Sequence, residues 1–478
     1  MSRLIIVISC LLLSFTTNAK SELLDIQNFS KASEFTGVKI SPTGKYLAVI
    51  TQPEGKNALM ILDTDTFKVL HAIHFPGNAQ VGNYYWVNEE RIVLAKEYLK
   101  GWKDHPEYHG ELLGVNADGS QWKYLVGYQG ERQTGTRIKK ATPVLGTSYV
   151  LDPLVENKRK MLVLTIPWTA ANEPHTIVYE VDVYRGSRKR ITRSPSRMAS
   201  FLTDHEGNVR VSASTDDYIN PKIYIRPKSG GEWEELNLKD VSYSDVGLHA
   251  FDSTDGSAYV TASVNGEAKG LYKLNLKTKQ FDLIHKEKSV SPKQVWVDEV
   301  SKELFAVEHE LGYPTYSFVG NNSKKSQQLK ALLKVLEGQQ VQLVSSTVNG
   351  DKSVIFASSD TNPGSYYLFD AKTNNLGFLF SSRSWIKPSQ MAITKPINFT
   401  ARDGLAIYGY LTIPNNAEEK NLPLVVMPHG GPHGPRDWWG YDSTAQLLAS
   451  RGIAVLKVNF RGSGGFGRNF ERAGHRKW

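Results

Sequence analysis

Short runs of alternating apolar and polar residues, separated by polar turns, fill the chain from about 35 to 384. One such unit, 38–50, consists of two alternating runs on either side of a turn at Pro42–Gly44. Similar units recur at 201–211 and 250–260. Alternation with a period of two residues is typical of β-strands that bury one face. We therefore expect this part of the chain to be all-β.

These units repeat at a nearly constant spacing. Gly207 and Gly256 are 49 positions apart, and Gly350 follows Gly256 after 94 positions, which is two steps of 47. A period of roughly 40–50 residues with several strands per unit predicts a β-propeller. The copies indicate about seven blades over 20–390, with six or eight as alternatives. A pair of β-sandwiches would not need a fixed spacing. One helix is expected within this region, at 326–338, because its leucines recur at helical spacing.

The pattern changes after residue 391. Apolar runs at Leu405–Ile413, Leu422–Met427 and Ile453–Val458 predict strands, and the second is apolar enough to be expected at the buried centre of a sheet. A helix is expected at 443–451, with Asp442 or Ser443 as its cap. Strand, loop, helix and strand in this order predict a βαβ unit and a parallel sheet.

Composition places the chain among ordinary globular proteins of two or three domains. It has 478 residues, of which 40% are hydrophobic and 22% are charged. Its 57 basic and 48 acidic residues give a net charge of +9, spread along the chain. Nucleic-acid binding requires a dense basic stripe, so no nucleic-acid partner is expected.

The first nineteen residues predict a secretory signal peptide. A basic start is followed by an apolar run, Leu4–Phe15, and by the small residue Ala19. This run is shorter than the ~18–20 residues of a membrane span, and no later run resembles one. Cys10, the only cysteine, lies within it. We therefore expect a periplasmic or secreted protein without disulfides and without a membrane span in the mature chain.

Two glycine-rich loops follow the last two predicted strands. The first is His429-Gly430-Gly431-Pro432. In serine hydrolases an HGG loop points a backbone N–H at the carbonyl oxygen under attack, which makes the Gly431 amide the expected oxyanion donor. Taken alone, the motif fits an ordinary Gly/Pro turn equally well. The second is the turn loop Arg461-Gly462-Ser463-Gly464.

Three segments downstream of the predicted propeller carry a family resemblance. They read ITKPINFTARDGLAIYGYLTIP, LPLVVMPHGGPHGP and VLKVNFRGSGGFG. The chain resembles the prolyl oligopeptidase family of serine peptidases, closest to its acylaminoacyl-peptidase and dipeptidyl-peptidase-like branch. The resemblance implies an all-β propeller that covers an α/β-hydrolase domain, here the N-terminal part of one at 391–478. It further implies hydrolysis of short peptides without a cofactor, with Gly431 in the oxyanion hole.

The residues that attack the peptide bond are not expected in this chain. A nucleophile of this type sits in Gly-x-Ser-x-Gly and is followed by an acid and a histidine. The only Gly-x-Ser is Gly146-Thr147-Ser148, and Val150 occupies the closing glycine position. A pair of Ser463 with His475 would violate the chain order. The chain is therefore expected to be inactive alone, as a fragment, a frameshifted product or a pseudo-enzyme. A serine beside the HGGP loop in contact with an imidazole would contradict this expectation.

Other site types fit the sequence less well. Gly462–Gly467 satisfies G-x-G-x-x-G between a strand and a predicted helix at 468–473, the context of a dinucleotide fingerprint. The acid expected about 20 residues later is missing, because eleven residues follow Gly467. There is no Walker motif and no His-Glu-x-x-His, so neither a phosphate site nor a metal site is predicted. The alternative function is a propeller that binds peptides or a protein without catalysis.

Overall fold

The structure is a computed structural model of the chain. It describes residues 23–129, 143–169, 173–216, 220–237, 243–298, 301–319, 323–415, 417–431 and 433–477. The predicted signal peptide at 1–19, Cys10 and Pro432 lie outside these residues. Within them, no helix combines the length and the apolar character needed to cross a membrane.

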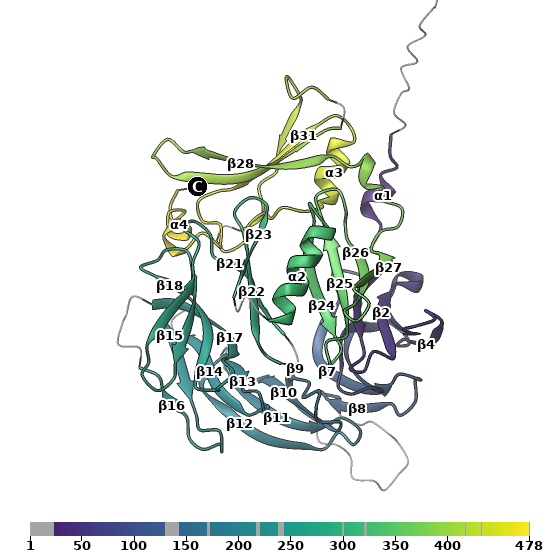
Figure 1. The fold of residues 1–478 in the computed structure, drawn as a ribbon, viewed down its shortest axis with the longest axis vertical. Coiled ribbons are helices and arrows are strands. Elements are labelled where there is room, and N and C mark those ends of the chain that lie inside the picture. Colours follow the sequence, from purple (N-terminus) through teal and green to yellow (C-terminus); the bar gives the residue numbers. More distant parts are fainter. Residues whose placement is uncertain are drawn as a thin grey trace, which may run out of the picture.

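Seven antiparallel sheets follow one another along the chain as the blades of a propeller (Figure 1), so the prediction of about seven blades is confirmed. We number the blades 1 to 7 in chain order; six have four strands and blade 6 has three.

Blades 1 and 2 contain β1 (Phe35–Ile40), β2 (Tyr46–Thr51), β3 (Ala58–Asp63), β4 (Val69–Ile73), β5 (Ala79–Trp86), β6 (Arg91–Tyr98), β7 (Glu107–Asn116) and β8 (Lys123–Val126). Blades 3 and 4 contain β9 (Gly146–Asp152), β10 (Lys160–Pro167), β11 (His175–Asp182), β12 (Arg188–Arg197), β13 (Ser200–Thr203), β14 (Val209–Asp216), β15 (Asn220–Ile225) and β16 (Glu234–Glu235). Blades 5 to 7 contain β17 (Tyr243–Phe251), β18 (Ser257–Val264), β19 (Gly270–Asn275), β20 (Phe281–His285), β21 (Pro292–Val297), β22 (Leu304–Glu310), β23 (Pro314–Phe318), β24 (Gln340–Ser346), β25 (Lys352–Ser358), β26 (Ser365–Asp370) and β27 (Asn375–Ser381). Short 3-10 turns occur at Pro53–Gly55 and Pro388–Gln390.

The helix predicted within the propeller is α2 (Lys324–Val335), which follows the three strands of blade 6. Its N-cap is Ser323, whose hydroxyl accepts a hydrogen bond from the Ser326 amide. The buried Leu329 and Leu332 pack into the apolar cluster between blades 6 and 7. The helix therefore fills space on the flank of the ring.

The ring closes between blade 1 and blade 7, which are separate sheets. Val38 and Ile40 of blade 1 share an apolar cluster with Val354 of blade 7. The Ile40 amide donates to Ser345 Oγ at 2.9 Å, and the Gly37 amide donates to the Tyr366 hydroxyl at 3.1 Å. Closure thus rests on side chains and on single hydrogen bonds between two complete sheets.

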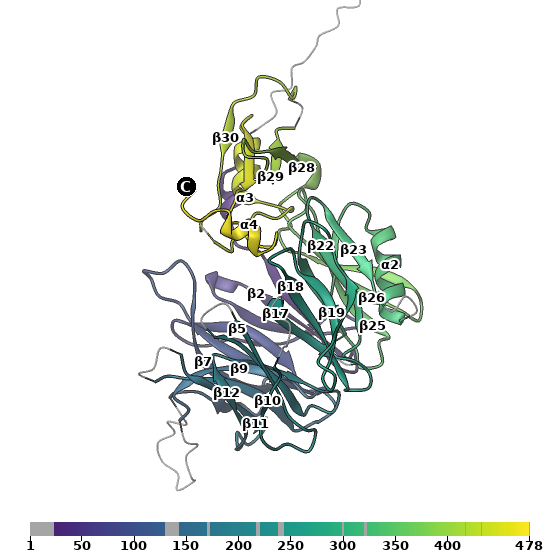
Figure 2. The same cartoon turned by 90° about the vertical axis from the view of Figure 1, so that its left-hand side faces the viewer.

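The C-terminal part lies above one face of the propeller (Figures 1 and 2) and is built on a second kind of sheet. Its elements are β28 (Ile393–Thr400), β29 (Ala406–Ile413), β30 (Leu424–Val426), α3 (Ser443–Ala449), β31 (Ala454–Asn459) and α4 (Arg468–Arg472). The predicted βαβ unit is present, because β30 and β31 are parallel neighbours and α3 connects them. The sheet is nevertheless mixed rather than parallel, since β28, β29 and β31 pair antiparallel in the order β28-β29-β31-β30.

The prediction that the first strand of this unit is buried at the centre of the sheet is wrong. β30 lies at the edge, and Leu424, Val425 and Val426 are 51%, 36% and 58% exposed. α3 packs on β29 and β31, so none of the described elements covers β30. An apolar sequence shows that a strand is suited to a buried position. Whether the strand is buried depends on which elements pack against it.

Glu310, at the end of β22, joins the propeller to the C-terminal part. This carboxylate is fully buried; its Oε1 accepts a hydrogen bond from the Tyr410 hydroxyl at 3.2 Å and another from the Trp439 amide. Lys293 of blade 6 lies 2.5 Å from its other oxygen. The N-terminal helix α1 (Gln27–Ser30) also contacts α3 of the C-terminal part (Figure 1).

Candidate functional site

The HGGP loop presents an open stretch of backbone. Gly430 and Gly431 are exposed, and neither has a positive φ. A Cβ added at Gly430 would meet nothing within 4 Å, and one at Gly431 would have its nearest neighbour at 3.5 Å. Among the described residues, neither amide donates a backbone hydrogen bond. The packing of this chain therefore does not require glycine here, and no described backbone carbonyl occupies the Gly431 amide, as an oxyanion donor requires.

The imidazole of His429, the first residue of this loop, is fixed in position. Its Nδ1 lies 2.9 Å from Oδ2 of Asp437, and its ring stacks on Phe460 with centroids 4.5 Å apart. Asp437 is held in turn by the fully buried Asn459, which accepts from the Asp437 amide at 2.7 Å and donates to its carbonyl at 3.1 Å. The histidine ring is thus held on one face and at one nitrogen.

The other ring nitrogen meets a serine. Oγ of Ser463, in the turn loop, lies 3.2 Å from Nε2 of His429. Ser463, His429 and Asp437 therefore have the order of contacts of a Ser-His-Asp triad. The expectation that no serine beside this loop contacts an imidazole is wrong. The pair that was considered from the sequence, Ser463 with His475, does not form; His475 packs instead against His433, with ring centroids 4.7 Å apart.

Ser463 is completely buried, and this limits what the contact can do. Its relative exposure is 0%, and its amide donates to the Phe460 carbonyl at 2.9 Å. The neighbouring Gly464 passes so close to Gly434 that an added Cβ would lie 2.1 Å from the Gly434 carbonyl oxygen. Nucleophilic attack needs a substrate carbonyl about 3–3.5 Å from the hydroxyl, and the complete burial of Ser463 leaves no access for one. In this conformation the contact ties two loops together.

The glycine-rich segment Gly462–Gly467, which begins in the turn loop, packs closely against other parts of the protein. Gly467 has φ 88° at the start of α4, and a Cβ there would lie 2.4 Å from the backbone of Glu267 in blade 5. A pyrophosphate would need this space, so the loop does not offer the cradle of a dinucleotide site. Arg461 forms a two-bonded ion pair with Asp403 at 2.6 and 3.0 Å, which lowers the pKa of that carboxyl to about 2.

Comparison with known proteins shows which family the chain resembles. The model of the prolyl oligopeptidase family matches residues 439–478. Dipeptidyl aminopeptidase BIII of Pseudoxanthomonas mexicana is 25% identical over 462 residues, which cover 93% of this chain and 62% of that protein. The acylamino-acid-releasing enzyme of Sus scrofa is 45% identical over 69 residues, or 14% of this chain and 9% of that protein. The chain is a relative of the prolyl oligopeptidase family.

Solved structures show the same fold as this prolyl oligopeptidase relative. A prolyl endopeptidase structure superposes with a TM-score of 0.65 at 12% identity, covering 94% of this chain and 65% of that one. A puromycin hydrolase structure gives 0.62 at 16% identity, with 95% and 70% covered. The chain spans slightly less than two thirds of the length of the dipeptidyl aminopeptidase that it matches.

The propeller of this family relative encloses a cavity on its axis. The cavity has a volume of about 390 Å³, and the first strand of every blade contributes to its wall. The wall residues from these strands include Ile40, Trp86, Leu151, Phe201, Ala250, Val297 and Ser345. The space is therefore shared by the whole ring.

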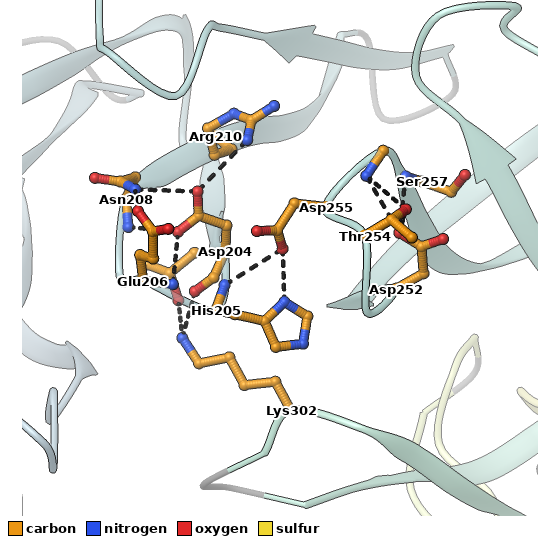
Figure 3. Close-up of polar contacts among 12 residues, drawn as sticks. Asp204, His205, Glu206, Asn208, Arg210, Asp252, Thr254, Asp255, Ser257 and Lys302 are labelled. Atoms are coloured by element: carbon orange, nitrogen blue, oxygen red, sulfur yellow. Dashed lines mark hydrogen bonds and ion pairs between the residues drawn. The ribbon is translucent and has the colours of Figure 1, made fainter.

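Lys302 closes this cavity at the end away from the C-terminal part. It precedes β22, whose other end carries Glu310 and the contact with the C-terminal part. Its ammonium lies 2.7 Å from Asp152 Oδ2, 3.1 Å from Thr203 Oγ1 and 2.7 Å from the Asp204 carbonyl, toward which it reaches in Figure 3. One side chain of blade 6 thus binds the turns of blades 3 and 4.

Sequence reasoning named the two loops of this site but missed the contact between them. Ser463 and His429 are 34 positions apart, yet each follows a strand of the same βαβ unit. Parallel neighbours bring their carboxyl ends to the same edge of a sheet, so the loops that follow them meet. This rule could have predicted from the sequence that His429 and Ser463 lie close together.

Proposed function

We propose that this chain takes part in the hydrolysis of short peptides, with the Gly431 amide as a donor to the oxyanion. The supporting observation is the exposed amide at the HGGP loop of a prolyl oligopeptidase relative. A donor of this kind contributes about 3–4 kcal/mol of transition-state stabilisation. The names of the relatives, dipeptidyl aminopeptidase and acylamino-acid-releasing enzyme, support short peptides as the substrate class.

We further propose that these 478 residues do not attack the peptide bond by themselves. Ser463, which has triad contacts in the described part of the chain, is fully covered, and no Gly-x-Ser-x-Gly occurs in the sequence. The role of Ser463 is therefore structural: its hydroxyl contacts His429 and so connects the turn loop with the HGGP loop.

A fluorophosphonate probe tests this assignment, because it labels activated serines. We expect no specific labelling of the purified chain and no hydrolysis of chromogenic dipeptides, with Ser463→Ala as the matched variant. Labelling that disappears in Ser463→Ala would show that the buried hydroxyl becomes accessible and acts as the nucleophile.

Binding without catalysis is a second candidate function, favoured by the cavity shared by all seven blades. Isothermal titration calorimetry of the purified chain with short peptides tests whether it binds them. Val348 lines the cavity and is 42% exposed, so Val348→Trp narrows the space without removing core packing. Val335 on α2, 70% exposed and away from the cavity, provides Val335→Trp as control. Peptide binding that only Val348→Trp weakens would support this function; equal binding by both variants would contradict it.

Export is part of the proposal, since the segment 1–19 has the pattern of a signal peptide. Sequencing the N-terminus of the protein recovered from its native host tests it. A mature chain that begins at or near Lys20 is expected, and an intact Met1 would contradict it.

A further inference from the structure

Two histidines and a glutamate meet between blades 5 and 6. His285 ends β20, Glu287 follows two residues later, and His309 lies in β22. The potential ligand atoms of the three residues all lie within 4.8 Å of one another. The two imidazole rings have centroids 5.0 Å apart and are inclined by 60°. Neither the peptidase proposal nor the contact between the two parts of the chain uses these residues.

The histidine nitrogens lack partners. His309 is 1% exposed, and within the described part of the chain neither of its ring nitrogens has a hydrogen-bond partner. The same holds for Nε2 of His285, because its 3.4 Å approach to Glu287 Oε1 does not have hydrogen-bond geometry. A buried polar atom without a partner destabilises the folded state. Each neutral ring has one N–H and one lone pair, so among the described residues the cluster lacks partners for both kinds of group.

The direction of His309 is set by the alternation of β22. The adjacent Glu308 bonds to Gln340 of blade 7, so His309 points to the opposite side, toward His285 of blade 5. An imidazole binds a metal through the lone pair of a ring nitrogen that carries no proton.

We propose that His285, Glu287 and His309 bind one divalent transition-metal ion. Two imidazoles and a carboxylate suit Zn²⁺ best among the common ions, and water would complete its coordination. The ligand atoms must draw closer than 4.8 Å, because Zn–N and Zn–O bonds are about 2.0–2.2 Å long. The side chains of His285 and Glu287 are 27% and 46% exposed and can move, whereas His309 is held by the core.

The place of the site indicates a structural role. The ion would tie the outermost strand of blade 5 to the middle strand of blade 6. Four residues beyond Glu287, the Ser291 amide donates to the carbonyl of Gly465, just after the turn loop, at 2.7 Å. His309 is also next to Glu310, which contacts the C-terminal part. A bound ion would therefore stiffen the edge of the propeller on which the C-terminal part sits.

Zinc titration of the metal-stripped chain, without a histidine tag, tests the proposal. Calorimetry should show one tight Zn²⁺ per chain, and saturating Zn²⁺ should raise the Tm by about 2 °C or more. The variants His285→Gln and Glu287→Gln change half-exposed side chains and should each weaken binding by more than about tenfold. His74→Gln, at an exposed histidine of blade 1, is the matched control.

Cobalt substitution adds a readout of the ligand set. Co²⁺ bound by imidazole nitrogens should give visible d–d bands, and these bands should be lost in His285→Gln but kept in His74→Gln. Absence of stoichiometric Zn²⁺ binding, or equal affinity of His285→Gln, Glu287→Gln and His74→Gln, would overturn the proposal. Because none of these measurements involves peptides, they are independent of the proposed peptidase role.

Discussion

At the scale of the residue, Lys302 shows how one charged side chain can be positioned by several blades. Its ammonium is 19% exposed and the Asp152 carboxylate is 10% exposed, so water screens this pair less than a surface pair. Thr203 also donates to the same carboxylate oxygen at 2.6 Å. Removal of the ammonium would leave a nearly buried carboxylate with two neutral donors, the Thr203 hydroxyl and the Leu154 amide.

We expect Lys302→Met to lower the free energy of unfolding by about 1–2 kcal/mol. Urea unfolding followed by tryptophan fluorescence measures this loss. Lys372→Met is the control, because Lys372 pairs with Asp351 while its side chain is 71% exposed. Equal midpoints for the two variants would show that Lys302 does not link the blades energetically.

His249 predicts a pH dependence of stability. Burial, and secondly the charge of Lys269, lower the pKa of this imidazole from 6.5 to about 4. Between these values the unfolded chain binds the proton and the folded chain does not, so stability is complete above about pH 6.5 and falls as the pH decreases toward 4. The contribution lost over this window is roughly 3 kcal/mol.

Unfolding measured between pH 4 and 7 checks this dependence. His249→Gln, which can keep a hydrogen bond to Thr261, should lose less stability over this window than the unmodified chain. His105→Gln, at an exposed position, should behave like the unmodified chain. Parallel pH curves for all three proteins would contradict the prediction.

At the scale of the element, local signals predicted α3 better than its neighbouring strand. Asp442 caps α3 by accepting from the amides of Thr444 and Ala445, as the sequence indicated, and its other oxygen lies 2.9 Å from Lys457. A cap depends on residues next to one another in the chain. The exposure of β30 depends instead on which elements cover it, and no pattern within Leu424–Val426 reports that.

Asp442→Ala should destabilise the C-terminal part by about 1–2 kcal/mol, because it removes the cap and leaves Lys457 without this partner. Asp442→Asn keeps the capping oxygen and should cost less. Hydrogen exchange of the α3 amides measures the effect locally. Similar protection in Asp442→Ala and the unmodified chain would show that packing alone holds the helix.

The difference between local signals and contacts between elements also explains which features of the site could be predicted from the sequence. Repeats and turns predicted the propeller, and the motif at 429–432 predicted the exposed Gly431 loop. The contact of His429 with Ser463 was missed because it depends on the pairing of two strands. The cluster of His285, Glu287 and His309 joins two blades and follows no ligand spacing along the chain, so a search for sequence motifs could not find it.

At the scale of the whole molecule, Glu310 connects the two parts of the chain. Its carboxylate has a partner on Lys293 in the propeller and on Tyr410 in the C-terminal sheet. Glu310→Gln would leave the Lys293 ammonium without its closest partner and weaken this junction by about 1–2 kcal/mol. Since 1.4 kcal/mol is a tenfold change in population, limited proteolysis between β27 and β28 should accelerate about tenfold.

Glu337→Gln, at an exposed position after α2, is the matched control for this experiment. It should be cleaved at the rate of the unmodified chain. If Glu310→Gln is cleaved no faster than Glu337→Gln, the two parts are held together by contacts other than this carboxylate.

The closure of the ring between two complete sheets has a mechanical consequence. In a propeller closed by a strand shared between its first and last blades, separating these blades breaks hydrogen bonds within a sheet. Here blades 1 and 7 share no strand, so their separation would leave every strand paired with its neighbours. Their separation would break the apolar contacts around Val38 and Val354, the backbone hydrogen bond from Val348 to Pro42, the ion pair of Lys352 with Asp65, and bonds such as that of Gly37 with Tyr366. The first and last blades are therefore joined by interactions between two sheets and share no strand.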